Sequence, residues 1–187
     1  MKHTNEGFSL IELIVVIAIM TVLTIGLAMG LSSVFRMEEK TAVETICGKL
    51  RYAQNSAMAK SFAYVSIEQA SDGYYINIVE GRGEKQRQEH KKLCSLETKL
   101  SYNTTMGSVQ QVIDESHPLQ LTYQKTSGAF APMIDKVEDN DTFTFVSYQD
   151  EGKTVRDCYC TGITLERDGR VSNIILYPKT GKCEKEP

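Results

Sequence analysis

Several features that would identify an enzyme are missing from this sequence of 187 residues. It has no Trp, only four Pro and only three His, which are His3, His90 and His117. It contains no nucleophile elbow, no phosphate-binding glycine loop of the Walker type and no HExxH metalloprotease motif. We therefore predict a protein that is not an enzyme and has no catalytic residues, no cofactor and no bound metal.

The sequence also lacks a large excess of positive or negative charge. The net charge is -3, which gives no overall attraction to nucleic acid or to an acidic membrane. When the apolar N-terminal arm is set aside, roughly 150 residues remain, which is about the size of one domain. The composition thus predicts one globular domain and leaves its function to local motifs.

The strongest local feature is at the N-terminus, where a short polar leader, Met1–Gly7, precedes an apolar run. Residues 13–35 are 23 residues without a charged side chain, and about 20 apolar residues cross a bilayer as a helix. The run is too long for the core of a secretory signal peptide, and no small-residue cleavage site follows it. We predict a membrane helix over residues 8–35, with the leader placed in the cytoplasm by Lys2.

Glu12 is the one charged residue between Leu10 and Phe35. A carboxylate at that depth is costly in lipid, so we expect it to have a function. In apolar surroundings it must become protonated or find a cation; the alternative is that it lies at the headgroups and is solvated there. Gly26 and Gly30 have the spacing of close helix packing or of a bend, although glycine is also simply frequent in membrane helices.

The helical pattern continues beyond the apolar run. Residues 37–60 contain no Pro, and their apolar residues recur at steps of three and four. We predict one helix from Phe8 to about Lys60, apolar all round in its first half and amphipathic over residues 36–60. The apolar face of the second half consists of Val43, Ile46, Cys47, Leu50, Ala53, Ala57 and Met58.

After Lys60 the periodicity changes to that of strands, and the turn signals Asp72-Gly73 and Asp168-Gly169 favour hairpins. We predict charged loops at residues 81–92 and 135–141. The predicted fold class is α+β, with a long N-terminal helix packed on an antiparallel β-sheet within a globular domain of residues 36–187. The predicted strands are 62–68, 74–79, one within 93–102, 119–123, 142–148, 161–167 and 170–177.

The five cysteines, Cys47, Cys94, Cys158, Cys160 and Cys183, cannot all pair within one chain. The Cys158-x-Cys160 spacing is not that of a zinc or redox C-x-x-C motif. If the domain is exported we expect one or two disulfides; otherwise some cysteines are small buried apolar residues. Because a hairpin lies between them, the first pairing to expect is Cys183 with either Cys158 or Cys160.

Each of the two charged loops, residues 81–92 and 135–141, is either an ordinary solvated loop or a binding site. Residues 81–92 hold five cations and two anions, and cations can contact DNA phosphates. The acidic residues 135–141 could bind calcium, although their spacing is not that of an EF-hand. The candidate DNA contacts are Arg82, Lys85, Arg87, Lys91 and Lys92.

The N-terminal phrase Gly7-Phe8-Ser9-Leu10-Ile11-Glu12, followed at once by a long apolar helix, resembles the class III signal of type IV pilins and type II secretion pseudopilins. Residues 1–35 match that pattern. Residues 47–58 and 163–182 look similar to the helix end and the late turn of the H-type (GspH/FimT-like) minor pseudopilins. Many pilins have a proline about two-thirds along the membrane helix, whereas in this sequence Met29 lies near that place.

The resemblance implies roles for three residues. A prepilin peptidase would cut between Gly7 and Phe8, removing residues 1–7, and would methylate the new amino group of Phe8. Glu12 would pair with that amine on a neighbouring subunit. The implied partners are the peptidase, other pilin or pseudopilin subunits, the cytoplasmic (inner) membrane and an assembly platform. The domain would lie outside the cytoplasm, first membrane-anchored by a single pass and then in a filament. The alternatives are a DNA-binding minor pilin of an uptake pilus and a signal-anchored protein that does not polymerise.

Overall fold

The computed structural model describes residues 10–59, 62–81, 86–138, 142–146, 148–150, 153–155 and 157–186. Within these ranges, side chains are described except for residues 25–36, 107–109, 138, 148–150 and 153–155. The contacts within the chain form two compact units, Met1–Glu38 and Glu39–Pro187, and each is considered by itself.

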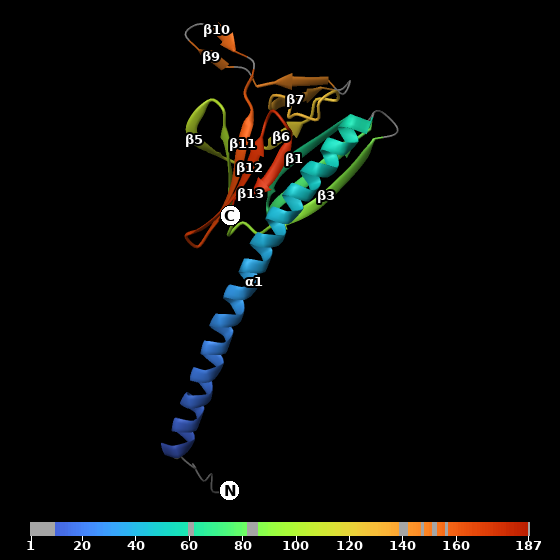
Figure 1. Ribbon diagram of the computed structural model, residues 1–187. Coiled ribbons are helices and arrows are strands. Elements are labelled where there is room, and N and C mark those ends of the chain that lie inside the picture. Colours follow the sequence, from blue (N-terminus) through green and yellow to red (C-terminus); the bar gives the residue numbers. More distant parts are fainter. Residues whose placement is uncertain are drawn as a thin grey trace. The chain divides into compact units, whose positions relative to one another are not determined.

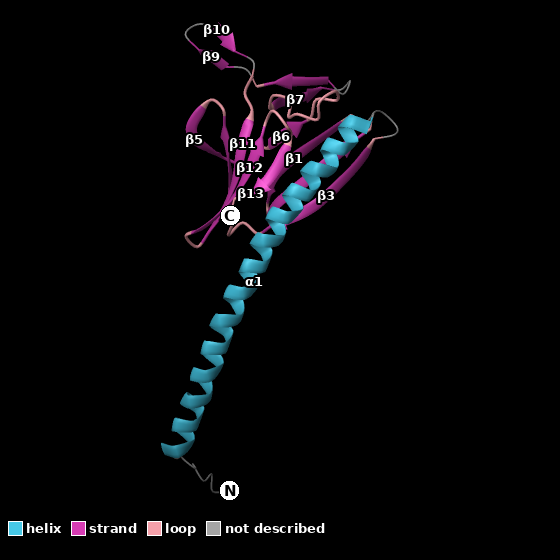
Figure 2. Ribbon diagram, in the orientation of Figure 1, coloured by secondary structure: helices cyan, strands magenta, loops and turns pink. Residues whose placement is uncertain are grey.

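One helix, α1, extends from Leu10 to Ala59. The predicted helix is therefore confirmed over these 50 residues, while Phe8, Ser9 and Lys60 lie outside the described residues. The rest of the described chain forms strands joined by turns and loops (Figures 1 and 2). In chain order they are β1 (Ala63–Ala70), β2 (Gly73–Glu80), β3 (Arg87–Cys94), β4 (Lys99–Thr104), β5 (Gly107–Val112), β6 (Leu119–Thr122), β7 (Ile134–Glu138), β8 (Thr142–Phe145), β9 (Tyr148–Asp150), β10 (Lys153–Val155), β11 (Cys160–Arg167), β12 (Arg170–Tyr177) and β13 (Lys182–Lys185).

The strands form two main sheets, in which the pairs of neighbouring strands are antiparallel. The first has the order β3-β2-β1-β6, and the second has the order β13-β12-β11-β4-β5. The pairs β7–β8 and β9–β10 form two small two-stranded sheets. The α+β prediction is confirmed, although the single predicted sheet is two main sheets with two additional hairpins.

The second half of α1 packs on this β structure because one of its faces is apolar. Ala42, Val43, Ile46, Leu50 and Ala53 are at most 2% exposed, and they join one core cluster with residues of both main sheets. The predicted apolar face is thus confirmed for most of its members. Met58 is an exception, because 48% of it is exposed.

The tight turn between β11 and β12 has a backbone that few residues adopt. Asp168 and Gly169 both have positive φ, at 50° and 75°, as a two-residue turn of the primed type requires. Aspartate and glycine are among the residues that tolerate this region best. The predicted Asp-Gly hairpin is confirmed.

The predictions of charged loops at residues 81–92 and 135–141 were partly wrong. Residues 87–92 belong to strand β3, which lies at an edge of its sheet and, among the described strands, pairs with β2 alone. An edge strand can carry many charges because its side chains remain in water, and the first six residues of β3 are all exposed. Residues 135–138 belong to β7, whose pairing with β8 supplies the ladder of hydrogen bonds. Residues 82–85 and 139–141 lie outside the described residues.

Candidate functional sites

The first part of α1 exposes apolar side chains on all its sides. From Leu10 to Leu23, the large apolar residues are between 45% and 78% exposed. The hydroxyls of Thr21 and Thr24 donate hydrogen bonds of 2.7 Å to the carbonyl oxygens four residues earlier. These hydroxyls are satisfied within the helix and need no partner outside it. The segment therefore presents a surface suited to apolar surroundings.

Glu12 lies in the first turn of α1 as described. A negative charge is favoured there by the helix dipole. The expected cleavage and methylation site, Gly7 and Phe8, lies outside the described residues. Cleavage between Gly7 and Phe8, methylation of Phe8 and the pairing of Glu12 in a filament therefore stay predictions.

Among the described residues, no helix is both long enough and apolar enough to cross a bilayer. The span expected at residues 8–35 includes Phe8, Ser9 and the side chains of residues 25–36, all outside the description.

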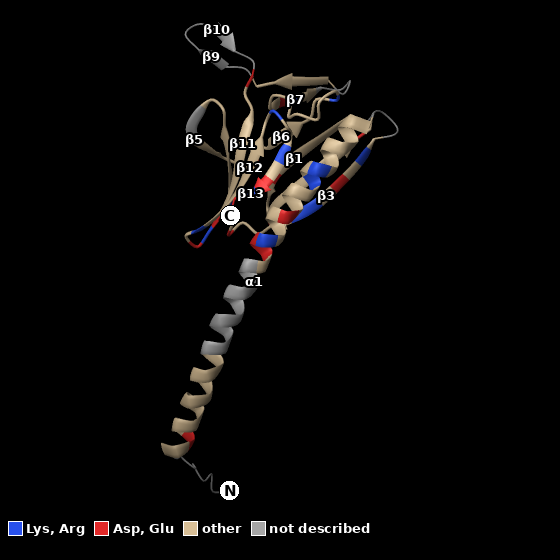
Figure 3. Cartoon of the chain, viewed as in Figure 1, with Lys and Arg blue, Asp and Glu red and all other residues tan. Residues whose placement is uncertain are grey.

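The described candidate DNA contacts do not form one basic patch. Lys92 makes an ion pair of 2.7 Å with Asp72, and the hydrogen bonds from Lys92 and Tyr75 hold the pKa of Asp72 below its ordinary value. Lys91 lies instead 3.4 Å from the hydroxyl of Thr45 on α1. Blue and red segments both occur along β3 in Figure 3, so acidic and basic side chains are mixed there.

Arg87, the remaining described candidate, lies in an acidic neighbourhood. It lines a small pocket beside Glu80 and Glu89. Glu80 accepts hydrogen bonds from Tyr52 and Ser56 of α1, and its bond with Tyr52 raises the pKa of that phenol. Glu89 pairs with Lys49. The contacts of Glu80, Glu89 and Lys91 attach β2 and β3 to the helix, whereas Lys92 pairs with Asp72 in the turn between β1 and β2. Arg82 and Lys85 lie outside the described residues.

The predicted disulfide partner of Cys183 was wrong. Cys183, on β13, is bonded to Cys47 on α1, with 5.6 Å between their Cα atoms. Cys158 and Cys160 keep their thiols. Cys47 lies on the helix face that packs on the β structure, and β13 comes beside that face. The one signal for this bond was the position of Cys47 on the predicted apolar face of the helix.

Cys158 and Cys160 are buried residues, with 5% and 3% of their surface exposed. Burial raises the pKa of Cys160 to about 12, and it also raises the pKa of Cys158. Because a thiolate is the reactive form of cysteine, these two side chains are poor nucleophiles and metal ligands. They act as small apolar residues, which was one of the two interpretations of the sequence.

In the described part of the chain, no three His, Cys, Asp or Glu side chains meet in a group that could hold a metal ion. Most of the acidic segment considered for calcium is the strand β7, and residues 139–141 are outside the description.

Comparison with known families gives one match. Residues 2–28 match the prokaryotic N-terminal methylation motif. This motif is characteristic of type IV pilins and pseudopilins, and the α+β fold of the described residues is pilin-like. It implies a subunit that is processed by prepilin peptidase, assembles with other pilins and is anchored in the inner membrane before assembly. Pilins are structural proteins and not enzymes. No curated protein and no solved structure matches the chain.

Proposed function

We propose that the chain is a minor pilin or pseudopilin, a structural subunit of a type IV pilus or a type II secretion-like filament. The observation that carries this proposal is the contrast between the two parts of α1. Residues 42–57 bury their apolar face in the core, whereas residues 10–23 expose apolar side chains all round. A helix of the second kind needs lipid or other protein around it. A filament core supplies such surroundings by packing the same segment of many subunits.

Processing would convert the membrane form into the assembly form. Prepilin peptidase cuts between Gly7 and Phe8, and the absence of a side chain lets Gly7 enter a narrow protease site in an extended form. The new amine of Phe8 is methylated. Glu12 of one subunit then pairs with the amine of a neighbour, which fixes the axial position of each added subunit. Such a head-to-tail contact repeats without closing and generates a helical polymer.

The H-type (GspH/FimT-like) assignment also belongs to the proposal. It is supported by residues 47–58, which form the end of α1 before β1, and by residues 163–182, which contain the β11–β12 hairpin and the Thr180-Gly181-Lys182 turn. A minor subunit of this kind would help to start or cap a filament. Identification of the subunits that co-purify with the chain would test this part of the proposal.

The N-terminus of the mature chain tests the processing step. In cells with active prepilin peptidase, mass spectrometry should find a chain that begins with methylated Phe8. Gly7→Val should leave the chain uncut, because the added side chain obstructs the cleavage site. Gly48→Ala is the matched control, since a Cβ there would meet nothing within 4 Å. A wild-type chain that still begins at Met1 would refute the proposal.

A role in DNA uptake remains a prediction with weaker support. The described cations Arg87, Lys91 and Lys92 lie beside acidic groups or contact other elements of the domain. The full chain in micelles would have to bind DNA in a salt-dependent way. Charge reversal at Arg82 and Lys85 would have to abolish that binding. Absence of binding at low salt would end this alternative.

A further inference from the structure

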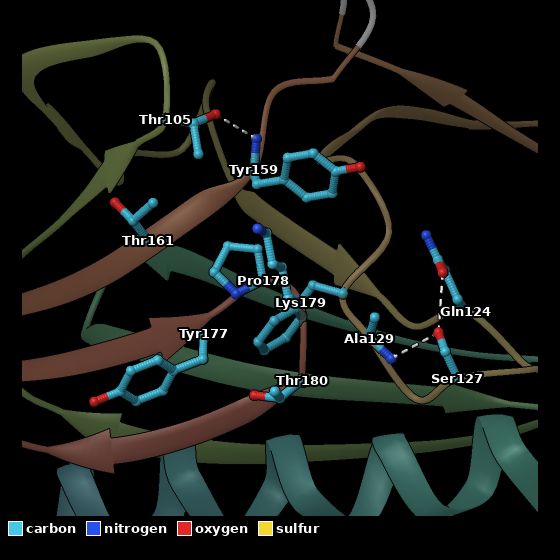
Figure 4. Close-up of a pocket in the computed structure, with 11 residues that line it drawn as sticks. Thr105, Gln124, Ser127, Ala129, Tyr159, Thr161, Tyr177, Pro178, Lys179 and Thr180 are labelled. Atoms are coloured by element: carbon cyan, nitrogen blue, oxygen red, sulfur yellow. Dashed lines mark hydrogen bonds between the residues drawn. The ribbon is translucent and has the colours of Figure 1, made fainter.

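A pocket of about 880 Å³ opens in the globular unit and has no part in the proposed assembly. Its size lies within the roughly 300–1,000 Å³ typical of ligand sites. Two loops supply most of its lining: residues 124–130 follow β6, and residues 177–180 end β12 and lead to β13. The rest comes from Thr105 after β4 and from Tyr159 and Thr161 at the start of β11. Figure 4 shows the side chains that line it.

The two loops are held together before any ligand arrives. The backbone N–H of Phe130 donates to the carbonyl oxygen of Pro178 at 3.0 Å. From the helix, Gln54 donates to the carbonyl oxygen of Gly128 at 2.7 Å and to that of Thr180 at 3.1 Å. Phe130 is only 2% exposed and stacks on Tyr123, with 4.6 Å between the ring centroids. The pocket is therefore preformed, which lowers the entropy that a ligand must lose on binding.

The lining combines rings, hydroxyls and one cation. Phe130, Tyr159, Tyr177 and Pro178 supply rigid apolar surfaces, and 41% of Tyr177 is exposed to solvent. Lys179 is the one charged residue among the described lining residues. A carboxylate outside the lining, that of Glu184 on β13, accepts a hydrogen bond of 3.3 Å from the hydroxyl of Tyr177. The aliphatic hydroxyls belong to Thr105, Ser127, Thr161 and Thr180.

These groups match the chemistry of a sugar that carries a carboxylate. One face of a sugar ring presents C–H groups that can stack on an aromatic ring. Its hydroxyls both donate and accept, as do those of threonine and serine. A carboxylate would complement Lys179 through a charge-assisted hydrogen bond. A proline-rich peptide, the other common occupant of aromatic grooves, offers mainly neutral carbonyl acceptors and therefore lacks an anion to complement Lys179.

We propose that this pocket binds an acidic saccharide, with a sugar ring on Tyr177 and a uronic carboxylate at Lys179. Saccharide binding is independent of the proposed assembly role, because the exposed domain surface carries it and no filament is needed to measure it. Failure of one proposal therefore leaves the other standing.

The test uses the full chain in micelles of a polyoxyethylene detergent, which contains no sugar. Three probes are titrated at low salt: a hyaluronan tetrasaccharide, which carries carboxylates, chitotetraose, which is neutral, and a proline decapeptide. The hyaluronan fragment should bind about fivefold more tightly than chitotetraose. Tyr177→Ala should weaken both saccharides about tenfold. Lys179→Gln should weaken only the hyaluronan fragment and remove its advantage.

Two variants serve as controls outside the pocket. Lys99→Gln removes an exposed cation at the start of β4, and Tyr75→Ala removes a ring on the other main sheet; neither should change saccharide binding. No saccharide binding at millimolar concentration would overturn the proposal. So would saccharide binding that Tyr177→Ala and Lys179→Gln leave unchanged, or a preference for the proline decapeptide that Tyr177→Ala abolishes.

Discussion

The side-chain amide of Gln54 on α1 donates a hydrogen bond of 2.7 Å to the backbone carbonyl oxygen of Gly128. The same nitrogen lies 3.1 Å from the carbonyl oxygen of Thr180. One helix residue therefore joins two loops that are more than 50 residues apart in the sequence, and both loops line the pocket. Backbone carbonyls in such loops need a donor, and here the helix supplies it.

Gln54→Ala should lower the free energy of unfolding of the globular unit by about 1–2 kcal/mol, because two carbonyl groups lose their donor. Asn55→Ala is the matched control, since Asn55 is the exposed neighbour on the same helix. Both variants introduce alanine into α1, so the change in helix propensity is similar. Denaturant unfolding of the full chain in micelles, followed by circular dichroism, measures the difference. Equal stability of the two variants would show that the bridge contributes nothing.

Gly181→Ala should be more destabilising than Gly169→Ala. The two glycines have nearly the same φ, 69° and 75°, so an alanine in the left-handed region costs each about 1–2 kcal/mol. At Gly169 a Cβ would meet nothing within 4 Å, whereas at Gly181 it would overlap the carbonyl oxygen of Gly128. The difference in unfolding free energy between the variants isolates this contact. If both lose the same stability, the two loops are not in contact in solution.

Features governed by local rules could be predicted from the sequence. The uninterrupted helix follows from steps of three and four and from the absence of proline. The β11–β12 hairpin follows from Asp168-Gly169, which suits a turn with positive φ. The edge strand β3 was missed because its charged residues resemble a solvated loop, and only its pairing with β2 makes it a strand.

Features that depend on packing could not be read from the chain. Cys47 and Cys183 are 136 residues apart and meet only because α1 packs beside β13. Cys158 and Cys160 lie closer in sequence to Cys183 but keep their thiols. The pocket has the same origin, because Phe130 and Pro178 come together through a hydrogen bond between distant loops. The motif around Gly7, Phe8 and Glu12 needs no packing information and was found from the sequence alone.

The Cys47–Cys183 disulfide should stabilise the globular unit by about 2–4 kcal/mol, since it closes a long loop of the unfolded chain. The double variant Cys47→Ser/Cys183→Ser should lose this amount of unfolding free energy. Dithiothreitol should lower the stability of the wild type to a similar level and leave the double variant unchanged. Peptide mapping under non-reducing conditions should recover one cross-linked pair with these two cysteines. A cross-link from Cys183 to Cys158 or Cys160 would contradict the structure.

The buried thiol of Cys160 should make stability fall at high pH. Its pKa in the folded state is raised to about 12 from an ordinary value of 9.0. Below pH 9 the thiol is neutral in both states; between these two values the unfolded chain loses a proton that the folded chain keeps. The pH dependence of unfolding free energy should therefore be weaker in Cys160→Ala, whose tyrosines and other groups are unchanged. The same pH dependence of unfolding free energy in the wild type and in Cys160→Ala would rule out this effect.

The same burial predicts how the thiols react with iodoacetamide. At pH 8 the folded chain should leave Cys158 and Cys160 unmodified, because their raised pKa keeps them protonated and burial keeps them from the reagent. After unfolding in denaturant without reductant, three cysteines should react, while Cys47 and Cys183 remain joined. Mass spectrometry counts the added groups. Rapid modification of Cys160 in the folded chain would show that it is accessible.

Glu12→Gln should separate processing from assembly. Glutamine keeps the shape of the side chain but removes the charge that would pair with the amine of a neighbouring Phe8. Loss of one partner of an ion pair in apolar surroundings costs about 3–5 kcal/mol, so incorporation into filaments should fall by at least about tenfold. Cleavage and methylation at Phe8 should remain normal, as mass spectrometry of the membrane fraction can show. Glu44→Gln, an exposed position on the same helix, is the control and should assemble normally. Normal incorporation of Glu12→Gln would remove the pairing role, because a neutral side chain cannot form the ion pair.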